Sequence, residues 1–202
     1  MTDRLKSAPQ KTDVGDDARD RELLEAVRAG DRAAFQELYV KYYHLLLRFI
    51  YRITGQLESA QEGVNDVMLV VWHSAASFEG KSRVSTWMFG IAYRKALKLR
   101  QGARRWTDRF KAADAESDEL SAPVSEHIGR TDLRDLRDLL DHGMRSLPAK
   151  QRAVVELTYF YGYSYEEIAT IVDCPVNTVK TRMFHARARL KTLLPALGKD
   201  SL

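Results

Sequence analysis

The chain has 202 residues, of which 45% are hydrophobic and 30% charged, enough apolar material for a packed core, which excludes wholesale disorder. Its single cysteine, Cys174, excludes an intramolecular disulfide and fits a reducing compartment, and no apolar run approaches the roughly 20 residues needed to cross a bilayer. The formal net charge is only +4, but the cations gather in two stretches on either side of an acidic one, a pattern that fits either two contacts with a polyanion or two solvated helix faces.

The first part of the chain is predicted to be a polar tail followed by a helical domain. Residues 1–19 are polar and are expected to be disordered. They lack the apolar centre of a signal peptide, so we expect a cytoplasmic protein. The helical domain is predicted over 20–102. A first helix is interrupted at Gly30, and Asp31 is a good N-cap for the next one. Apolar residues at helical spacing mark the later helices, among them Leu38, Tyr42, Phe49, Val64, Val67, Met68, Val71, Trp87, Met88 and Ile91.

A change of composition separates this domain from a second one. Residues 103–130 are rich in Ala, Ser, Asp and Glu and contain Pro123 and Gly129, which predicts a flexible acidic linker. A second helical domain is predicted over 131–197. The fold class is therefore all-α, with two small helical domains joined by a flexible linker.

The end of the second domain carries a helix-turn-helix pattern. Ser164 and Glu167 form a capping box before a short helix, and Asp173 and Pro175 then break the apolar pattern. A second helix, about 176–194, is basic and contains no acidic residue. Asp173 stands where a turn glycine is common, and Asp tolerates left-handed backbone better than most residues. The side chains predicted to enter a DNA major groove are Asn177, Thr178, Lys180, Thr181, Arg182 and His185.

Two further positions favour a helix-turn-helix over a simple helical hairpin. Ala169 is small where the two helices must approach, and Val179 is apolar where the second helix rests on the first. The alternative interpretation is a hairpin whose basic face is merely solvated.

Three runs in this domain, 147–152, 162–169 and 175–182, resemble the C-terminal domain of extracytoplasmic-function (ECF) sigma factors. The resemblance implies that the domain reads the −35 element of promoter DNA. Asn177 stands where glycine is usual in that family, which implies that one contact to the DNA differs.

The first domain resembles the N-terminal domain of the same family. The run 60–72 is similar to the helix that docks on the clamp coiled coil of the β′ subunit of core RNA polymerase. The implied polymerase contacts are Glu62, Asn65 and Asp66. Ser59 and Val70 replace an aspartate and a basic residue that are usual in the family, which implies a shifted affinity for polymerase.

The run 78–92 is similar to the segment that recognises and melts the −10 element, where the family captures a base flipped out of the non-template strand. The implied contacts with −10 DNA are Lys81, Ser82, Arg83 and Ser85, together with Arg94, Lys95 and Lys98, which are expected to hold phosphates.

The resemblance thus implies a sigma factor that binds core RNA polymerase and promoter DNA and catalyses nothing. It further implies an anti-sigma partner, which could hold the protein at the inner face of the membrane. We find no phosphate loop, metal-ligand cluster or nucleophile–base set, so neither a cofactor nor a small-molecule substrate is expected. A helix-turn-helix regulator that acts without being a polymerase subunit is the alternative.

Overall fold

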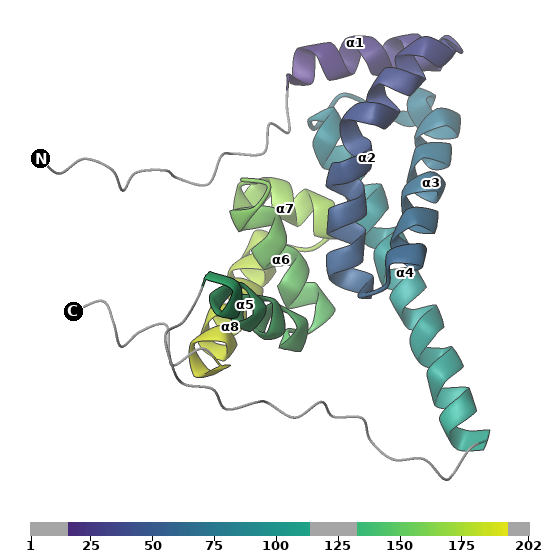
Figure 1. Ribbon diagram of the computed structural model, residues 1–202. Helices are drawn as coiled ribbons and strands as arrows, with labels where there is room; N and C mark the ends of the chain where they lie inside the picture. Colours follow the sequence, from purple (N-terminus) through teal and green to yellow (C-terminus); the bar gives the residue numbers. More distant parts are fainter. Residues whose placement is uncertain (1–15, 114–132, 194–202) are drawn as a thin grey trace, which may run out of the picture.

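The computed structural model describes residues 16–113 and 133–193, and within these ranges the chain forms α-helices, one 3-10 turn and no strand (Figure 1). The predicted all-α class is confirmed. Most of the predicted N-terminal tail, residues 1–15, lies outside the described residues. The last three residues of the predicted tail, 17–19, are helical. The side chain of Asp16 caps this helix by accepting a hydrogen bond from the Arg19 N–H at 3.3 Å.

The first domain contains four α-helices and a short 3-10 helix. They are α1 (Asp17–Arg28), α2 (Arg32–Thr54), α3 (Leu57–Ser74), η1 (Ala75–Ser77) and α4 (Val84–Ala113). The predicted N-cap before α2 is confirmed, since the Asp31 carboxylate accepts from the Ala33 N–H at 2.8 Å. Gly55, in the left-handed region with φ of 80°, ends α2.

The boundary that the sequence places at residue 102 is wrong, because α4 continues to Ala113. Residues 103–113 contain neither glycine nor proline, so nothing in them stops a helix that is already formed. The rest of the predicted linker, 114–130, lies outside the described residues.

Helix α2 lies at the centre of the first domain and packs against α1, α3 and α4. Its residues Leu38, Leu46, Phe49 and Ile50 are fully buried. The helices pack closely at Gly63 of α3, where an added Cβ would meet side-chain atoms of Leu99 and Ile50 at 3.0 and 3.1 Å. The three long helices therefore share one tightly packed core.

The second domain consists of α5 (Leu133–Ser146), α6 (Ala149–Tyr159), α7 (Tyr165–Val172) and α8 (Val176–Leu193). Gly162, after α6, has a φ of 70°, and the next residue, Tyr163, donates its N–H to the Leu157 carbonyl at 3.0 Å. This turn changes the direction of the chain, so that α7 crosses α6. The core of the domain is formed by Leu147, Ala153, Val154, Leu157, Ile168, Ile171, Val179 and Ala186.

The two domains lie against each other (Figure 1), with α7 on α4 and α6 on α2. Tyr161, between α6 and α7, is buried against the first domain. Its ring centroid lies 4.8 Å from that of Phe89, and its hydroxyl donates to the Leu45 carbonyl at 2.9 Å. The structure is therefore one closed arrangement of two helical modules.

Candidate nucleic-acid and polymerase interfaces

The helix-turn-helix predicted in the second domain is formed by α7 and α8. Both halves of the capping box are present, because Ser164 Oγ accepts from the Glu167 N–H at 3.2 Å and the Ser164 N–H donates to Glu167 Oε2 at 2.9 Å. Asp173 adopts the left-handed region with φ of 48°, and the Cys174 N–H donates to the Ala169 carbonyl at 3.1 Å. The tight turn forms without the glycine that is common there.

One face of α8 is buried on its own domain and the opposite face is free. Val179, Met183 and Ala186 are buried. Asn177, Lys180, Thr181 and His185, which the sequence predicts as major-groove contacts, are exposed. The remaining two predicted contacts, Thr178 and Arg182, are partly buried. Most of the predicted set therefore lies on one accessible face.

The exposed face of α8 also carries a residue that the sequence interpretation did not single out. The Phe184 side chain is 69% exposed, although a phenylalanine is costly to leave in water. Further along, Arg187 Nη2 donates to the Tyr159 hydroxyl at 2.6 Å and is thereby tied to α6.

The predicted polymerase contacts lie together on α3. Glu62 and Asn65 are exposed, whereas Asp66 is partly buried and accepts a hydrogen bond from Lys95 Nζ at 2.9 Å. The Tyr39 hydroxyl donates to Asn65 Oδ1 at 2.9 Å and fixes the orientation of that amide. Lys95, predicted as a phosphate contact, is thus engaged with α3.

An apolar depression adjoins these polar residues, and the sequence did not predict it. It has a volume of about 360 Å³ and is lined by Phe35, Tyr39, Asn65, Met68, Leu69 and Trp72. Leu69 is 55% exposed, and a large apolar side chain in water beside the partly exposed Trp72 is the signal that could have found this surface. Together with Glu62 and Asp66 on the same helix, it forms a surface with an apolar centre and a charged edge.

The segment predicted for −10 recognition joins η1 to α4 and is held by α1. Arg21 Nη2 donates to the Ser82 carbonyl at 2.7 Å, and its guanidinium lies 5.5 Å from the Phe78 ring centroid. Asp17 Oδ1 accepts from the Val84 N–H at 2.8 Å and so caps α4. Arg21 and Asp17 support this loop from more than 60 positions away in the chain, which local sequence patterns do not reveal.

The residues predicted to contact −10 DNA fall into two groups. Lys81, Arg94 and Lys98 are exposed. Arg83 is also exposed but forms an ion pair with Glu167 of α7, whereas Ser85 is only 1% exposed, beside the second domain. The structure therefore does not bring the whole predicted set to one open surface.

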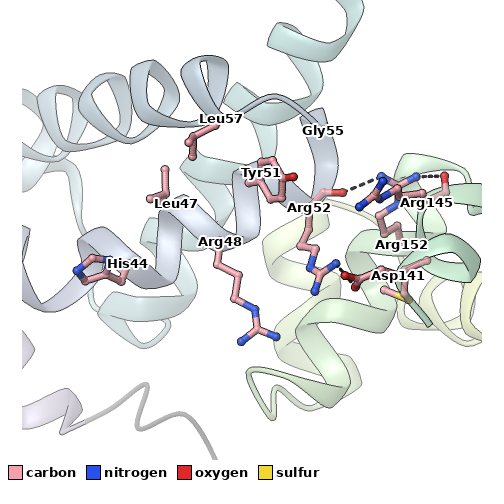
Figure 2. Close-up of a pocket in the computed structure, with 11 residues that line it drawn as sticks. His44, Leu47, Arg48, Tyr51, Arg52, Gly55, Leu57, Asp141, Arg145 and Arg152 are labelled. Carbon is pink, nitrogen blue, oxygen red and sulfur yellow. Dashed lines mark hydrogen bonds and ion pairs between the residues drawn. The ribbon is translucent and has the colours of Figure 1, made fainter. Parts of the chain in front are cut away.

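An arginine-rich pocket of about 460 Å³ lies between the domains, and the sequence did not predict it (Figure 2). Arg52 of α2 points to Asp141 of α5, with 2.6 Å between Nη1 and Oδ1, and Arg152 Nη1 donates to the Arg52 carbonyl at 2.7 Å. Glu156 is fully buried, with Oε1 3.4 Å from Arg52 Nε. The two domains are thus joined by charged groups at this pocket as well as by aromatic rings.

Burial shifts the ionisation of two charged groups at this junction. Burial raises the pKa of Glu156 to about 7, against the opposing effects of Arg52, Arg48 and Arg152. Burial also lowers the pKa of Arg152 to about 10, with nearby Arg100 acting in the same direction. The charges in this pocket therefore depend on its being closed.

No group of three or more His, Cys, Asp or Glu within 16–113 and 133–193 could hold a metal ion. Of the helices in those same ranges, none is long and apolar enough to cross a membrane.

Comparison with known proteins matches both domains. Residues 38–106 match the family model described as Sigma-70 region 2, and residues 137–190 match Sigma-70, region 4. The RNA polymerase sigma-H factor of Pseudomonas aeruginosa is 34% identical over 187 residues, covering 90% of this chain and 97% of that one. The ECF RNA polymerase sigma-E factor of Escherichia coli K12 is 33% identical over 173 residues, covering 83% of this chain and 90% of that one.

Two solved structures share the fold. The sigma factor RpoE of Bartonella quintana, solved in complex with the anti-sigma factor NepR, is 27% identical with a TM-score of 0.60, covering 80% of this chain and 96% of that one. CnrH, solved in complex with the cytosolic domain of CnrY, is 24% identical with a TM-score of 0.63, covering 88% of this chain and 98% of that one.

Proposed function

The chain belongs to the ECF family of RNA polymerase sigma factors, and on this basis we propose that its two domains divide promoter recognition between them. The first domain binds core RNA polymerase and the −10 element, and the second reads the −35 element. The protein acts by binding and by holding DNA open, and it catalyses no reaction itself.

Helix α3 is the proposed docking element for the β′ clamp coiled coil. Its exposed Glu62 and Asn65 stand beside the apolar depression around Leu69. An apolar centre bordered by charges is the usual composition of a specific protein interface. Asp66 contributes a negative charge, which its contact with Lys95 holds in place.

Helix α8 is the proposed reader of the −35 element. A capped helix-turn-helix presents its second helix with Asn177, Lys180, Thr181 and His185 exposed, and within the described part of α8 no acidic residue opposes DNA phosphates. This basic face on a helix-turn-helix, following a region-2 domain in the same chain, is the observation on which the proposal chiefly rests.

The loop between η1 and α4 is the proposed −10 element reader. Lys81 is exposed at its tip, and Arg94 and Lys98 are exposed on the helix that follows. Capture of an extruded base by this loop offsets the cost of unstacking, and the lysines and arginine hold the strand's phosphates. Arg21 and Asp17 keep the loop in place.

We further propose control by an anti-sigma factor. RpoE of Bartonella quintana, whose fold this chain shares, was solved in complex with one. Core polymerase and promoter DNA are in the cytoplasm, so the protein works there, and a membrane-bound anti-sigma factor could retain it at the inner face of the membrane.

The test is transcription in vitro with purified core RNA polymerase on a library of randomised promoters. We expect the full chain to bind core enzyme and to select promoters that share two elements at a fixed spacing. Binding to duplex DNA without any binding to core would contradict the proposal and favour a helix-turn-helix regulator that is not a polymerase subunit.

A further inference from the structure

The arginine-rich pocket carries more positive than negative charge. Four arginines line it against a single carboxylate, and these residues are Arg48, Arg52, Arg145, Arg152 and Asp141. The carboxylate is already paired with Arg52. Because burial raises the pKa of Glu156 to about 7, this neighbouring residue offsets only part of a positive charge at neutral pH. The pocket therefore has an excess of positive charge that an anion would balance.

Helix capping explains only some of these cations. Arg152 Nη1 donates to the Arg52 carbonyl, and Arg100 Nη1 donates to the Ile53 carbonyl at 2.8 Å, at the end of α2 where cations are favoured. The side chains of Arg48 and Arg145 make no such bond within the described residues, and they form no ion pair there. Both are exposed in the pocket and able to meet an anion from solvent.

Arg152 adds a buried charge to the wall of the pocket. It is 5% exposed, and its Nε atom is buried without a hydrogen-bond acceptor among the described residues. Its terminal nitrogens donate to the carbonyl oxygens of Arg52, Arg145 and Leu147, which bring no full negative charge. Burial, together with the nearby Arg100, lowers the pKa of Arg152 to about 10. A bound anion would stabilise this cation.

The pocket also has an apolar part that is open to solvent. Leu57 is 53% exposed and Tyr51 is 39% exposed, and the partly buried Leu47 lies beside them in the lining. In the view of Figure 2, Leu47 and Leu57 lie to one side and Arg145 and Arg152 to the other. Large apolar side chains left in water mark a surface that a ligand can cover. The lining thus suits a molecule with an anionic group and an apolar body.

We propose that this pocket binds a nucleotide, with its phosphates among the arginines and its base against Tyr51 and Leu57. The volume of about 460 Å³ lies within the roughly 300–1,000 Å³ of small-molecule sites. Guanidinium groups match the geometry of phosphate oxygens, and an aromatic ring can stack on a tyrosine. None of the lining residues belongs to the proposed DNA or polymerase interfaces, so this site goes beyond the proposed function.

The experiment measures binding of ADP to the full-length chain by isothermal titration calorimetry at constant ionic strength. Adenosine and inorganic phosphate, each of which carries one half of the ligand, are titrated in parallel. We expect ADP to bind saturably at one site, and the two halves to bind at least roughly tenfold more weakly, because each meets only one part of the pocket. ADP should also raise the temperature of thermal unfolding, since it binds only the folded protein.

Three variants locate the site on the protein. Arg145→Ala should lower the affinity for ADP roughly tenfold, because one charge-assisted contact with a phosphate is lost. Tyr51→Ala should weaken the binding of ADP and leave that of inorganic phosphate unchanged. Arg189→Ala removes an exposed arginine of α8 and is the matched control, which should bind ADP like the unmodified chain. If circular dichroism shows that Arg145→Ala does not fold, Arg48→Ala takes its place.

Several results would overturn the proposal. One is the absence of saturable ADP binding, and another is an affinity for ADP that Arg145→Ala leaves unchanged. A loss of ADP binding in Arg189→Ala would place the anion on the basic face of α8 instead. Equal affinities for ADP and inorganic phosphate would refute the assignment to a nucleotide. None of these results bears on the proposed function, which the binding of core polymerase tests separately.

Discussion

Arg52 and Asp141 lie 89 residues apart in the chain and join the two domains through an ion pair of 2.6 Å. Both side chains are mostly shielded, with 22% and 30% of their surface exposed. Arg52 also approaches the buried Glu156 and accepts, through its carbonyl oxygen, a hydrogen bond from Arg152. Arg52 of the first domain therefore contacts three charged residues of the second, Asp141, Arg152 and Glu156.

Reversing the charge of Asp141 should weaken the closed arrangement. Asp141→Arg places a second cation against Arg52, and we expect the free energy of unfolding to fall by about 1–3 kcal/mol, the usual cost of removing one partner from a shielded pair. Chemical denaturation of the full chain measures this. The control is Arg19→Ala, which removes exposed pairs with Glu37 and Glu22 and should change the free energy of unfolding much less than Asp141→Arg does. Equal losses for the two variants would contradict the structural role given to Asp141.

Glu156 should make the stability of the protein depend on pH. Burial raises the pKa of its carboxyl group to about 7 from its ordinary value of 4.5. The folded state thus holds a proton that the unfolded state releases, and the free energy of unfolding should fall as pH rises from about 4.5 to about 7 and then level off. Each pKa unit corresponds to about 1.4 kcal/mol, so the contribution amounts to a few kcal/mol at most.

Glu156→Gln isolates this contribution, because the amide does not titrate. We expect the difference in stability between Glu156→Gln and the unmodified chain to change across this pH window and to be constant above it. Thermal or urea denaturation at a series of pH values provides the measurement. A difference that does not vary with pH would mean that Glu156 is already ionised in the folded protein, paired with Arg52.

Arg182→Ala should weaken promoter binding without affecting the binding of core polymerase. Loss of an arginine that donates to a base is expected to cost about 1–3 kcal/mol in promoter affinity. The measurement is made on the complex with core enzyme. Arg189→Ala, an exposed cation further along α8, is the control and should give a smaller loss that is similar on all promoters. If Arg182→Ala also lost core binding, the substitution would have disturbed the fold.

Asp66→Arg should have the opposite pattern. It places a cation next to Lys95 on the proposed polymerase-docking face. We expect the affinity of the protein for core polymerase to fall by roughly tenfold or more, while its binding to a DNA duplex that carries the −35 element is unchanged. Glu58→Arg makes the same change of charge at an exposed position in the first turn of α3 and is the matched control. Normal core affinity of Asp66→Arg would remove this residue from the interface.

Local patterns predicted the features that depend on neighbouring residues. The capping box at Ser164, the N-cap at Asp31 and the turn at Asp173 each involve hydrogen bonds over a few positions, and all three are present. The α7–α8 motif and the exposure of Lys180 follow from such signals, because residues that are close in sequence determine both the turn and the periodicity of a helix.

Contacts between distant segments were not predictable in the same way. Ser85 was expected on a DNA-binding surface, but Tyr163 and its neighbours, nearly 80 positions later, cover it. Nothing near Arg52 in sequence indicates that it pairs with Asp141. The length of α4 was also underestimated, since residues 103–113 resemble a linker in composition but contain no glycine or proline that would end the helix.

The hydrogen bond from the Val84 N–H to Asp17 has a practical consequence. Helix α4, which follows the proposed strand-opening loop, is capped by the carboxylate of Asp17, near the beginning of the described residues. Removing the amino-terminal end of the chain would therefore alter a site far along the polypeptide. A shortened protein intended for biophysical work should start ahead of Asp16. One beginning a turn later would lose both caps, and its behaviour on DNA would reflect an unsupported loop.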